Sequence, residues 1–426
     1  MTAPAVEGGA ITRKRALGVL YDRSFRLYWT GQTLSGAGNA LSSVALVFAA
    51  INLGRSTTGI GLVLLAGRVP VIGLTLAGGI IGDRYARRLV MIGSDSVRTV
   101  VQGITAALLL TGHGSIGGLA ALQACSGAAS ALFGPASSGL VANLAPAGRA
   151  REANSMLSMS KSVAQIGAVA AGGAIVASLG AGVAFAVDAA TFGASTITLA
   201  LCRSPALQAR PRQARSPVSQ LGEGWSAVRR RPWLVAYTAH ASLFNTLAVS
   251  ALFVLGPVVA KRHLGGAPAW AAIGVSYGAG ALGGSWLTLR WGPARPVLAA
   301  MAVSVGMAPL LVLLAIPSVL WAVLPAALVA GAQGTVYNTL TSACCQANVP
   351  DELLSRASSL VSLGALLGAP LGIGLAGAAA DAVGTKLVLG AGAAWAVLSA
   401  GAGMALPCVR APLPLVRAST PAKLPK

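Results

Sequence analysis

Six ionisable side chains interrupt otherwise apolar stretches of this chain: Arg68, Asp95, Arg98, Lys161, Asp188 and His240. A charge near the centre of a membrane helix costs about 2.5–3.5 kcal/mol on insertion scales, so such a group faces a bundle interior or a wet cavity. There it exchanges protons, binds a charged substrate group or pairs with another side chain.

Arg68 and Asp188 are the first candidates for such chemistry. Arg68 stands alone in a long apolar run and is followed by Pro70, which loosens the local backbone. It is suited either to holding an anionic substrate group or to pairing with an acid, for which Asp188 is the candidate. If Asp188 titrates, it is the best candidate for proton coupling. The alternative is a permanent structural pair with Arg68 or with a group on a neighbouring helix.

Two further groups have both a functional and a structural interpretation. His240 is a candidate proton carrier, because histidine titrates near neutral pH; otherwise it is a hydrogen-bonded core residue. Lys161 lies near one end of its apolar segment and is expected to snorkel to the cytoplasmic interface. The sequence contains no Ser/His/Asp arrangement, metal-ligand cluster or nucleotide-binding loop, so we expect no enzyme activity, no cofactor and no bound metal.

The composition shows that these residues belong to a membrane protein. The 426 residues are 55% hydrophobic and 10% charged, with a mean hydropathy of +0.73, whereas soluble domains carry about 25% charged residues. The 54 glycines suit helices that pack closely in lipid. The net charge of +21 is scattered in short clusters with few aromatic residues, which argues against nucleic acid as a partner. The five cysteines are interpreted as small buried hydrophobic residues.

Twelve apolar runs are long enough to cross a bilayer, which takes about 20 residues. They are residues 27–51, 59–82, 89–112, 115–142, 154–178, 181–202, 233–259, 271–291, 295–316, 318–344, 357–379 and 385–408. With the N-terminus inside, most of the 31 basic residues fall in cytoplasmic segments. The external loops then hold Arg55, Lys261, Arg262 and Lys386. Because Lys- and Arg-rich loops stay in the cytoplasm, the chain is predicted to be a multi-pass protein of the inner (plasma) membrane with both termini cytoplasmic.

An internal repeat divides the segments into two groups of six. Gly79 corresponds to Gly284, and Asn143 corresponds to Asn348 at the same spacing. Two repeats of equal topology are expected where two bundles rock about a central site. The predicted domains are a cytoplasmic N-terminal tail (1–26), a first six-helix bundle (27–202), a cytoplasmic linker (203–232), a second six-helix bundle (233–408) and a cytoplasmic C-terminal tail (409–426).

The densest group of charges lies at the end of the second segment, in the stretch GGIIGDRYARR. Asp83 sits where this segment leaves the membrane, and a carboxylate there accepts hydrogen bonds from a neighbouring helix N-terminus. The repeat places the eleventh segment, which starts near Arg356, beside it. We expect these charges to latch the two bundles on the cytoplasmic side; the alternative is that the arginines only fix the orientation. The predicted latch comprises Gly79, Asp83, Arg84, Arg87, Arg88, Asp95 and Arg98.

This motif resembles that of the major facilitator superfamily of transporters, and the resemblance covers nearly the whole chain. Ala86 stands where the family motif usually has a glycine. The stretches RSFRLYWTGQTLSGAGNALSSVAL, AGRVP, LFGPASSGLV and GVAFAVDAATF are similar to the drug-exporter-like branch that contains macrolide and siderophore efflux proteins. Two departures are Asn39, which is more often aspartate in that branch, and Ala168, where exporters often carry a proline. The second departure weakens the assignment as an antiporter.

The resemblance implies an all-α membrane protein with 12 transmembrane helices in two six-helix bundles, the major facilitator fold. In that fold the first, seventh and tenth helices line a central cavity, and the polar residues on them here are Gln32, Asn39, Asn245, Gln333, Tyr337 and Asn338. Such a mixed cavity suits an amphiphilic compound.

The predicted function is therefore export of an amphiphilic small molecule (a drug, an antibiotic or a siderophore-like compound) by alternating access with proton antiport. The alternative is uptake or facilitated diffusion of a small molecule. A non-transporting receptor or scaffold is disfavoured, because the latch charges are retained. A monomer suffices, since each bundle can bury its polar groups against the other.

Overall fold

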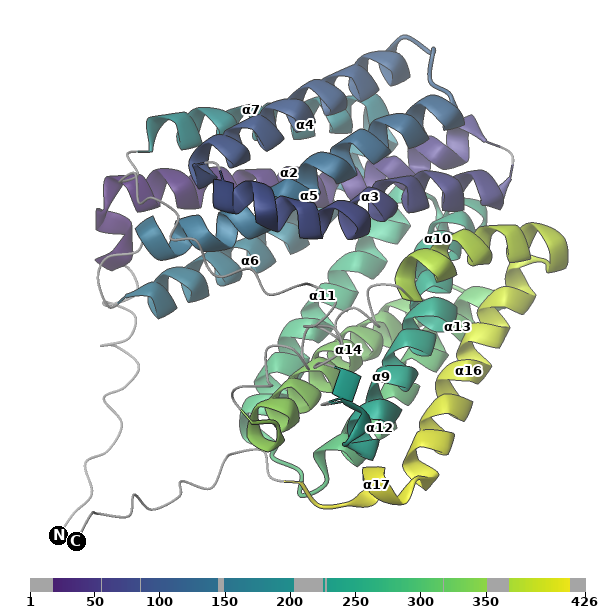
Figure 1. Ribbon diagram of the computed structural model, residues 1–426. Coiled ribbons are helices and arrows are strands. Elements are labelled where there is room, and N and C mark those ends of the chain that lie inside the picture. Colours follow the sequence, from purple (N-terminus) through teal and green to yellow (C-terminus); the bar gives the residue numbers. More distant parts are fainter. Residues whose placement is uncertain are drawn as a thin grey trace, which may run out of the picture. The chain divides into compact units, whose positions relative to one another are not determined.

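The fold was analysed in a computed structural model that describes residues 18–54, 56–84, 86–144, 149–202, 225–226, 228–316, 318–350 and 368–413. These residues form helices and contain no strand (Figure 1). The predicted all-α class is confirmed. Both predicted tails, apart from short flanking pieces, and most of the predicted linker lie outside the described residues.

The chain divides into two compact units, each of which is described by itself. Unit 1 comprises Met1–Arg212 and Gly265–Ala271, and unit 2 comprises Gln213–Leu264 and Ala272–Lys426. The helices of unit 1 are η1 (Gly18–Tyr21), α2 (Arg23–Leu53), α3 (Thr57–Arg84), α4 (Arg87–Leu110), α5 (Ile116–Leu144), α6 (Ala150–Ser178) and α7 (Ala181–Leu201).

Unit 2 contains the helices of the second half of the chain, with α11 starting in the short segment grouped with unit 1. They are α9 (Pro232–Phe244), η2 (Asn245–Val249), α10 (Ser250–Val259), η3 (Ala260–Leu264), α11 (Ala267–Arg290), α12 (Pro296–Ser304), η4 (Val305–Met307), α13 (Ala308–Ala315), α14 (Leu320–Asn348), the helix Gly368–Val383, α16 (Thr385–Ala405) and α17 (Pro407–Arg410). η2 and η3 are π-helical turns, and η4 is a 3₁₀ turn.

Within the described residues, nine helical segments are long and apolar enough to cross a membrane. The other predicted spans correspond to α4, α11 and the helix Gly368–Val383, which is a shorter apolar helix. α4 carries Asp95 and Arg98 within its length, and these charges lower its hydropathy. The count is consistent with the 12 predicted spans.

Helix ends differ from the predicted bounds for local chemical reasons. α2 begins at Arg23, earlier than predicted, because the Asp22 carboxylate accepts a hydrogen bond from the Phe25 backbone N–H at 2.8 Å. The seventh predicted span continues to Leu264, because the π turns prolong the helix without breaking it. Gly180 and Gly384 precede the last long helix of each unit with φ angles of 84° and 94°, which favour glycine.

Glycine contacts set the helix spacing inside each unit. In unit 1, α3 packs along α5, α4 packs along α7, and α2 contacts both α6 and α7. A side chain on Gly127 of α5 would collide with the Gly67 carbonyl oxygen of α3. In unit 2, a Cβ on Gly284 of α11 would lie 2.6 Å from the Ala332 carbonyl oxygen of α14. The abundance of glycine therefore reflects backbones in close contact.

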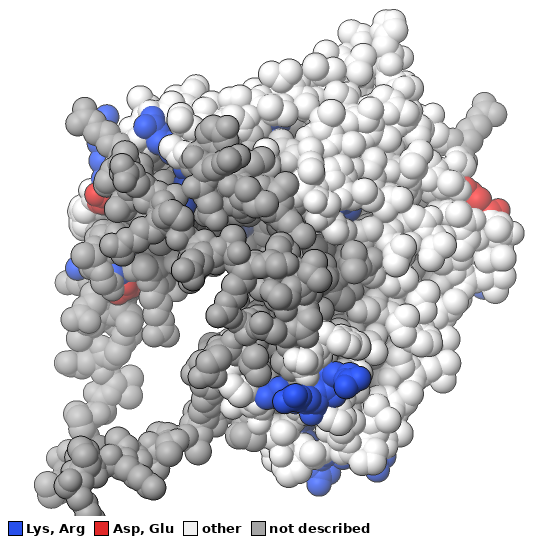
Figure 2. All heavy atoms as spheres, viewed as in Figure 1, with Lys and Arg blue, Asp and Glu red and all other residues white. Residues whose placement is uncertain are grey.

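Exposed charges are sparse on the described surface. Figure 2 shows one face on which most described residues are uncharged, with Lys and Arg gathered in a few small groups. Leucine, valine and tryptophan side chains are exposed along the helices, including Leu289, Trp321 and Leu398. In water such a surface is unfavourable, whereas in a bilayer it faces lipid. The chain is a multi-pass membrane protein.

Candidate functional site

Polar side chains on one face of α4 follow α7 along most of its length in unit 1. The contacting pairs, in order along α4, are Arg88 with Leu199 and Ala200, Asp95 with Ser195, Arg98 with Phe192, and Gln102 with Asp188. Residue numbers rise on α4 as they fall on α7, so the two helices are antiparallel. We call these residues the α4–α7 ladder.

Asp95 lies in the middle of the ladder and is fully buried. Its Oδ2 accepts a hydrogen bond of 2.7 Å from the Ser195 hydroxyl, and its Oδ1 lies 3.7 Å from Arg98 Nη1. The Ser195 hydroxyl in turn accepts a hydrogen bond of 3.4 Å from Gln32 Nε2 of α2. The carboxylate is therefore held by a charge-assisted hydrogen bond and an ion pair.

Lys161 extends this chain of contacts to α6. Its Nζ donates to Gln32 Oε1 at 3.4 Å, and its charge interacts with that of Asp95. The Lys161 ammonium group therefore has a polar partner on α2, and its snorkelling to the cytoplasmic interface stays a prediction. The Gln32 amide and the Asp95 carboxylate give the ammonium group polar partners inside the bundle, a role that water at the membrane interface would otherwise fill.

The Arg98 guanidinium is the central cation of the site, with a side chain only 11% exposed. Besides Asp95, its Nη2 donates to Asn39 Oδ1 of α2 at 3.3 Å, and its Cζ lies 3.8 Å from the centre of the Phe192 ring. Its charge also interacts with that of Asp188. Stacking on an aromatic face together with hydrogen bonds in the guanidinium plane suits arginine and not lysine.

Asp188 is the second fully buried carboxylate of unit 1. Its Oδ2 accepts a hydrogen bond of 2.8 Å from Gln102 Nε2, and the Ser42 hydroxyl of α2 also interacts with the carboxylate. A Cβ on Gly38 would lie 2.6 Å from Asp188 Oδ1, so a glycine here lets the carboxylate approach α2. Asp188 is thus surrounded mainly by neutral groups, with Arg98 as its nearby cation.

The structure separates the two residues whose pairing was considered first. Arg68 of α3 is exposed, whereas Asp188 is buried against α2 and α4. Arg98 supplies the positive charge that Arg68 was considered to supply. An exposed arginine within an apolar helix remains suited to binding an anionic group.

The predicted latch is described only in part. Gly79, Asp83 and Arg84 lie in α3, but their side chains are outside the described residues, as is the segment around Arg356. Arg87 is partly exposed at the start of α4. The described contacts of Arg88, Asp95 and Arg98 are all made within unit 1.

Gln102, Ser195 and Phe192 were not identified from the sequence as site residues. A usable signal was present: Asp95, Arg98 and Gln102 recur at helical spacing on α4, and Asp188, Phe192 and Ser195 recur likewise on α7. Two such faces, one in the third and one in the sixth predicted helix, would have suggested a shared polar interface.

Unit 2 contains the remaining predicted site residues. His240 of α9 is 6% exposed, and Gln333 and Tyr337 of α14 are 5% and 8% exposed. Asn245 Nδ2 donates to the Ala241 carbonyl and Asn338 Nδ2 to the Gly334 carbonyl, each within its own helix. The structure therefore brings His240 and Tyr337 together, with ring centres 5.7 Å apart, while each of the two asparagines bonds to its own helix.

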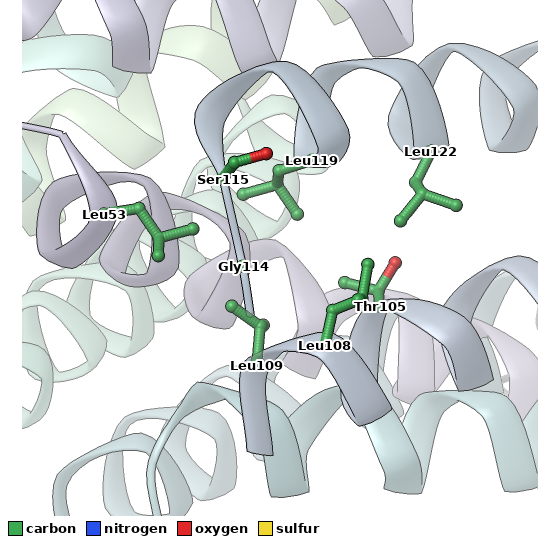
Figure 3. Close-up of a pocket in the computed structure, with 8 residues that line it drawn as sticks. All are labelled: Leu53, Thr105, Leu108, Leu109, Gly114, Ser115, Leu119 and Leu122. Atoms are coloured by element: carbon green, nitrogen blue, oxygen red, sulfur yellow. The ribbon is translucent and has the colours of Figure 1, made fainter. Parts of the chain in front are cut away.

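A small hollow lies near the turn between α4 and α5. Figure 3 shows that leucine side chains dominate its lining, with Thr105 and Ser115 as the hydroxyl-bearing members. The lining residues are Leu53, Thr105, Leu108, Leu109, Gly114, Ser115, Leu119 and Leu122. None of them ionises, so this hollow offers no proton or charge chemistry. The candidate site is the α4–α7 ladder with its partners on α2 and α6.

Comparison with known proteins places the chain among transporters. The sequence model of the family described as "Major Facilitator Superfamily" matches residues 28–373. An uncharacterized MFS-type transporter, YfiS, of Bacillus subtilis (strain 168) is 28% identical over 219 residues, which are 50% of this chain and 51% of that protein. The match thus spans about half the length of this curated relative.

Solved structures of transporters have a similar fold. A variant of the peptide transporter POT is matched with a TM-score of 0.73 at 11% identity, over 96% of this chain and 100% of that one. The nucleoside transporter NupG gives 0.69 at 13% identity, over 90% and 98%. A bacterial homolog of the human lysosomal transporter Spinster, in an inward-facing and unoccupied conformation, gives 0.63 at 16% identity, over 95% and 98%. At these identities the likeness concerns the fold.

Proposed function

The chain belongs to the Major Facilitator Superfamily, and we propose that it is a secondary active transporter that exports an amphiphilic small molecule in exchange for protons. Membership establishes a membrane transporter of this type. The direction, the ion and the substrate class (a drug, an antibiotic or a siderophore-like compound, as in the drug-exporter-like branch that the sequence resembles) are the proposal. It includes an inner-membrane location, cytoplasmic termini and a monomeric protein.

One observation carries the proposal: the buried carboxylates Asp95 and Asp188 share the Arg98 guanidinium. Burying an ion is costly unless it is paired and hydrogen-bonded. Asp95 interacts with two cations, Arg98 and Lys161, and with the Ser195 hydroxyl. Asp188 interacts with one cation, Arg98, and otherwise with neutral hydrogen-bonding side chains. Because fewer cations stabilise its ionised form, we assign proton coupling to Asp188.

The Gln102 side chain provides a partner for either form of Asp188. Its Nε2 donates to the carboxylate, and its Oε1 has no hydrogen-bond partner among the described residues. Rotation of the amide would present Oε1 to a protonated Asp188, since a protonated carboxyl group donates a hydrogen bond. Protonation of Asp188 would remove its negative charge, so that Arg98 would keep Asp95 and Asn39 as its polar partners. The contacts that hold α4, α7 and α2 together would then change in strength.

A second function, uptake or facilitated diffusion, is favoured by the charge balance of the same network. Asp95 and Asp188 are matched by Arg98 and Lys161, so the network is neutral when all four groups are ionised. A neutral network is stable without a proton and would then serve only to hold the helices. Ala168, where exporters often carry a proline, also fits this function.

The cytoplasmic latch remains part of the proposal. Asp83 at the end of α3 would accept hydrogen bonds from the N-terminus of the eleventh predicted segment, which is expected to start near Arg356. The described contacts support a different role for Arg88, whose guanidinium binds the last carbonyl groups of α7 at Leu199 and Ala200. Cations there complement the negative end of the helix.

Proton release in energised inverted membrane vesicles tests the proposal. Amphiphilic antibiotics, dyes and siderophores would be added while the lumenal pH is recorded. We expect at least one compound to release protons from vesicles with the wild-type protein and none to do so with Asp188→Asn. The matched control is Asp22→Asn, because Asp22 is an exposed helix cap and asparagine caps helices equally well.

Two results would contradict the proposal. Release that persists in Asp188→Asn but is lost in Asp95→Asn would move the coupling acid to Asp95. A wild-type protein that moves a compound across the membrane with no change in lumenal pH would show transport without proton exchange. Facilitated diffusion or uptake would then be the function.

A further inference from the structure

An aromatic and polar cluster in unit 2 has no role in the proton chemistry described above. The His240 ring lies between two aromatic rings, with centre-to-centre distances of 5.5 Å to Phe244 and 5.7 Å to Tyr337. The Tyr237 ring lies 5.4 Å from that of Tyr337. Gln333 lies one helical turn before Tyr337 on α14, which places both on one side of that helix, and the Gln333 Cβ and Cγ lie near Gly306 of η4.

Several polar atoms of this cluster are buried without a hydrogen-bond partner. They are His240 Nδ1 and Nε2, Gln333 Oε1 and the Tyr337 hydroxyl, and none has a partner among the described residues. By contrast, the Tyr237 hydroxyl interacts with the Thr341 side chain. Buried polar groups are normally satisfied, and several unsatisfied groups in one place point to a ligand that satisfies them.

Among the described residues of unit 2, no acid, lysine or arginine is buried around the cluster. The buried polar residues described in unit 2 are His240, Ser250, Ser304, Gln333 and Thr341, and none of these is an acid, a lysine or an arginine. A charged ligand group in this place would meet no buried counter-ion among the described residues of unit 2, which is costly. A neutral ligand group meets no such penalty.

The backbone next to the cluster departs from a regular α-helix. The π turn Asn245–Val249 follows Phe244 directly and is stabilised by the Ser250 hydroxyl, which donates to the Asn245 carbonyl at 2.7 Å. The same hydroxyl and that of Thr246 donate to the Ala369 and Gly368 carbonyls, respectively, of the helix Gly368–Val383. π turns occur frequently at functional sites, and this one is fixed by side chains that also join the two helices.

We propose that Tyr237, His240, Phe244, Gln333 and Tyr337 form a recognition subsite for an uncharged aromatic ring that carries hydrogen-bonding groups, such as a phenol. The rings supply flat apolar contacts. His240 in its neutral form offers one donor and one acceptor, the Tyr337 hydroxyl offers both, and Gln333 Oε1 accepts. This inference deepens the proposed function and rests on transport of an amphiphilic compound, but it assigns substrate selection to unit 2 and proton coupling to unit 1.

Binding of the fluorescent phenol umbelliferone tests the subsite without relying on proton movement. Fluorescence anisotropy would be measured with the purified full-length protein in lipid nanodiscs, at mildly acidic pH where the phenol is uncharged, and the signal of empty nanodiscs would be subtracted. We expect saturable binding to the wild-type protein. Herniarin, the methyl ether, lacks the phenolic donor and should bind about threefold to tenfold more weakly. The carboxylic acid derivative should bind more weakly as well, because it brings a charge.

Variants locate the binding in the cluster. His240→Phe, Tyr337→Phe and Gln333→Leu keep the shape of the side chains and remove the polar atoms, so each should weaken umbelliferone binding by about threefold to tenfold. The matched control is Tyr28→Phe in unit 1, because the Tyr28 hydroxyl already pairs with Ser137 at 2.8 Å. Each variant must elute as a single peak in gel filtration, and the umbelliferone–herniarin comparison on the wild-type protein applies even if a variant fails to fold.

The outcomes separate this inference from the proposed function. Wild-type protein without saturable binding, equal affinity for umbelliferone and herniarin, or equal losses in Tyr28→Phe and Tyr337→Phe would overturn the subsite. If those tests succeed while no compound releases protons from vesicles, the subsite stands and proton antiport fails. If wild type and Tyr337→Phe need the same concentration of an aromatic compound for half-maximal proton release, antiport stands and the subsite is refuted.

Discussion

Replacement of Arg98 by glutamine tests whether this cation holds the two buried carboxylates together. The change removes the ion pair to Asp95 at 3.7 Å and the nearby positive charge of Asp188. Breaking a buried pair by removing one partner costs about 3–5 kcal/mol. For a domain of about 150–250 residues, each kcal/mol lowers the Tm by about 2–4 °C. We therefore expect Arg98→Gln to lower the Tm of the purified protein by about 6–20 °C in a detergent unfolding scan.

A second substitution sharpens this test. After the loss of Arg98, Asp95 keeps the Ser195 hydrogen bond and the charge of Lys161, whereas Asp188 keeps only neutral partners such as Gln102. Asp188→Asn in the Arg98→Gln background should therefore restore more of the lost Tm than Asp95→Asn does.

The matched control for the Arg98 experiment is Arg68→Gln, the same change at an exposed arginine in the same unit. It should change the Tm by no more than about 2 °C, as expected for an exposed side chain. The reasoning is refuted if Arg98→Gln is as stable as the wild-type protein. It is also refuted if Asp95→Asn restores the Tm and Asp188→Asn does not.

Three further predictions concern the helix packing and the topology. Gly127→Val should lower the Tm of the purified protein clearly more than Gly117→Val, because a Gly127 side chain would meet the Gly67 carbonyl while Gly117 has open space around it. Arg88→Met should lower the Tm by about 2–4 °C, since a capping interaction with helix carbonyls contributes about 1 kcal/mol. In intact cells, a membrane-impermeant maleimide should label Lys261→Cys and spare Arg410→Cys, in a background with Cys125 replaced; the reverse labelling pattern would invert the predicted orientation.

The membrane class could be predicted from the sequence because it depends on bulk composition. Apolar runs of sufficient length, separated by basic loops, indicate spanning helices whatever their packing. Helix ends were less predictable: Asp22 starts α2 earlier, and the π turn at Ala260–Leu264 prolongs the seventh span. Such features depend on individual hydrogen bonds that hydropathy does not record.

The arrangement of the site could be predicted only in part. Asp95, Arg98 and Asp188 were identified because charges are rare in apolar segments. Which of them meet depends on which helices are neighbours, and hydropathy carries no such information. Sequence alone therefore suggested Arg68 as the partner of Asp188, whereas the structure shows that the Asp188 charge interacts with that of Arg98. Lys161 was expected at the interface because its interior partner, Gln32, is an uncharged residue on another helix.

The buried charges and the aromatic cluster lie in different units, and this leads to a final prediction. The described buried acids belong to unit 1, and the described aromatic cluster with unpartnered polar atoms belongs to unit 2. Asp188→Asn should therefore abolish proton release in vesicles while leaving the affinity for umbelliferone within about twofold of wild type, as expected for independent sites. Tyr337→Phe should weaken that affinity while leaving the number of protons released per molecule transported unchanged. If Asp188→Asn weakens umbelliferone binding as much as Tyr337→Phe does, the charge network takes part in recognition, and the division of roles between the two units is wrong.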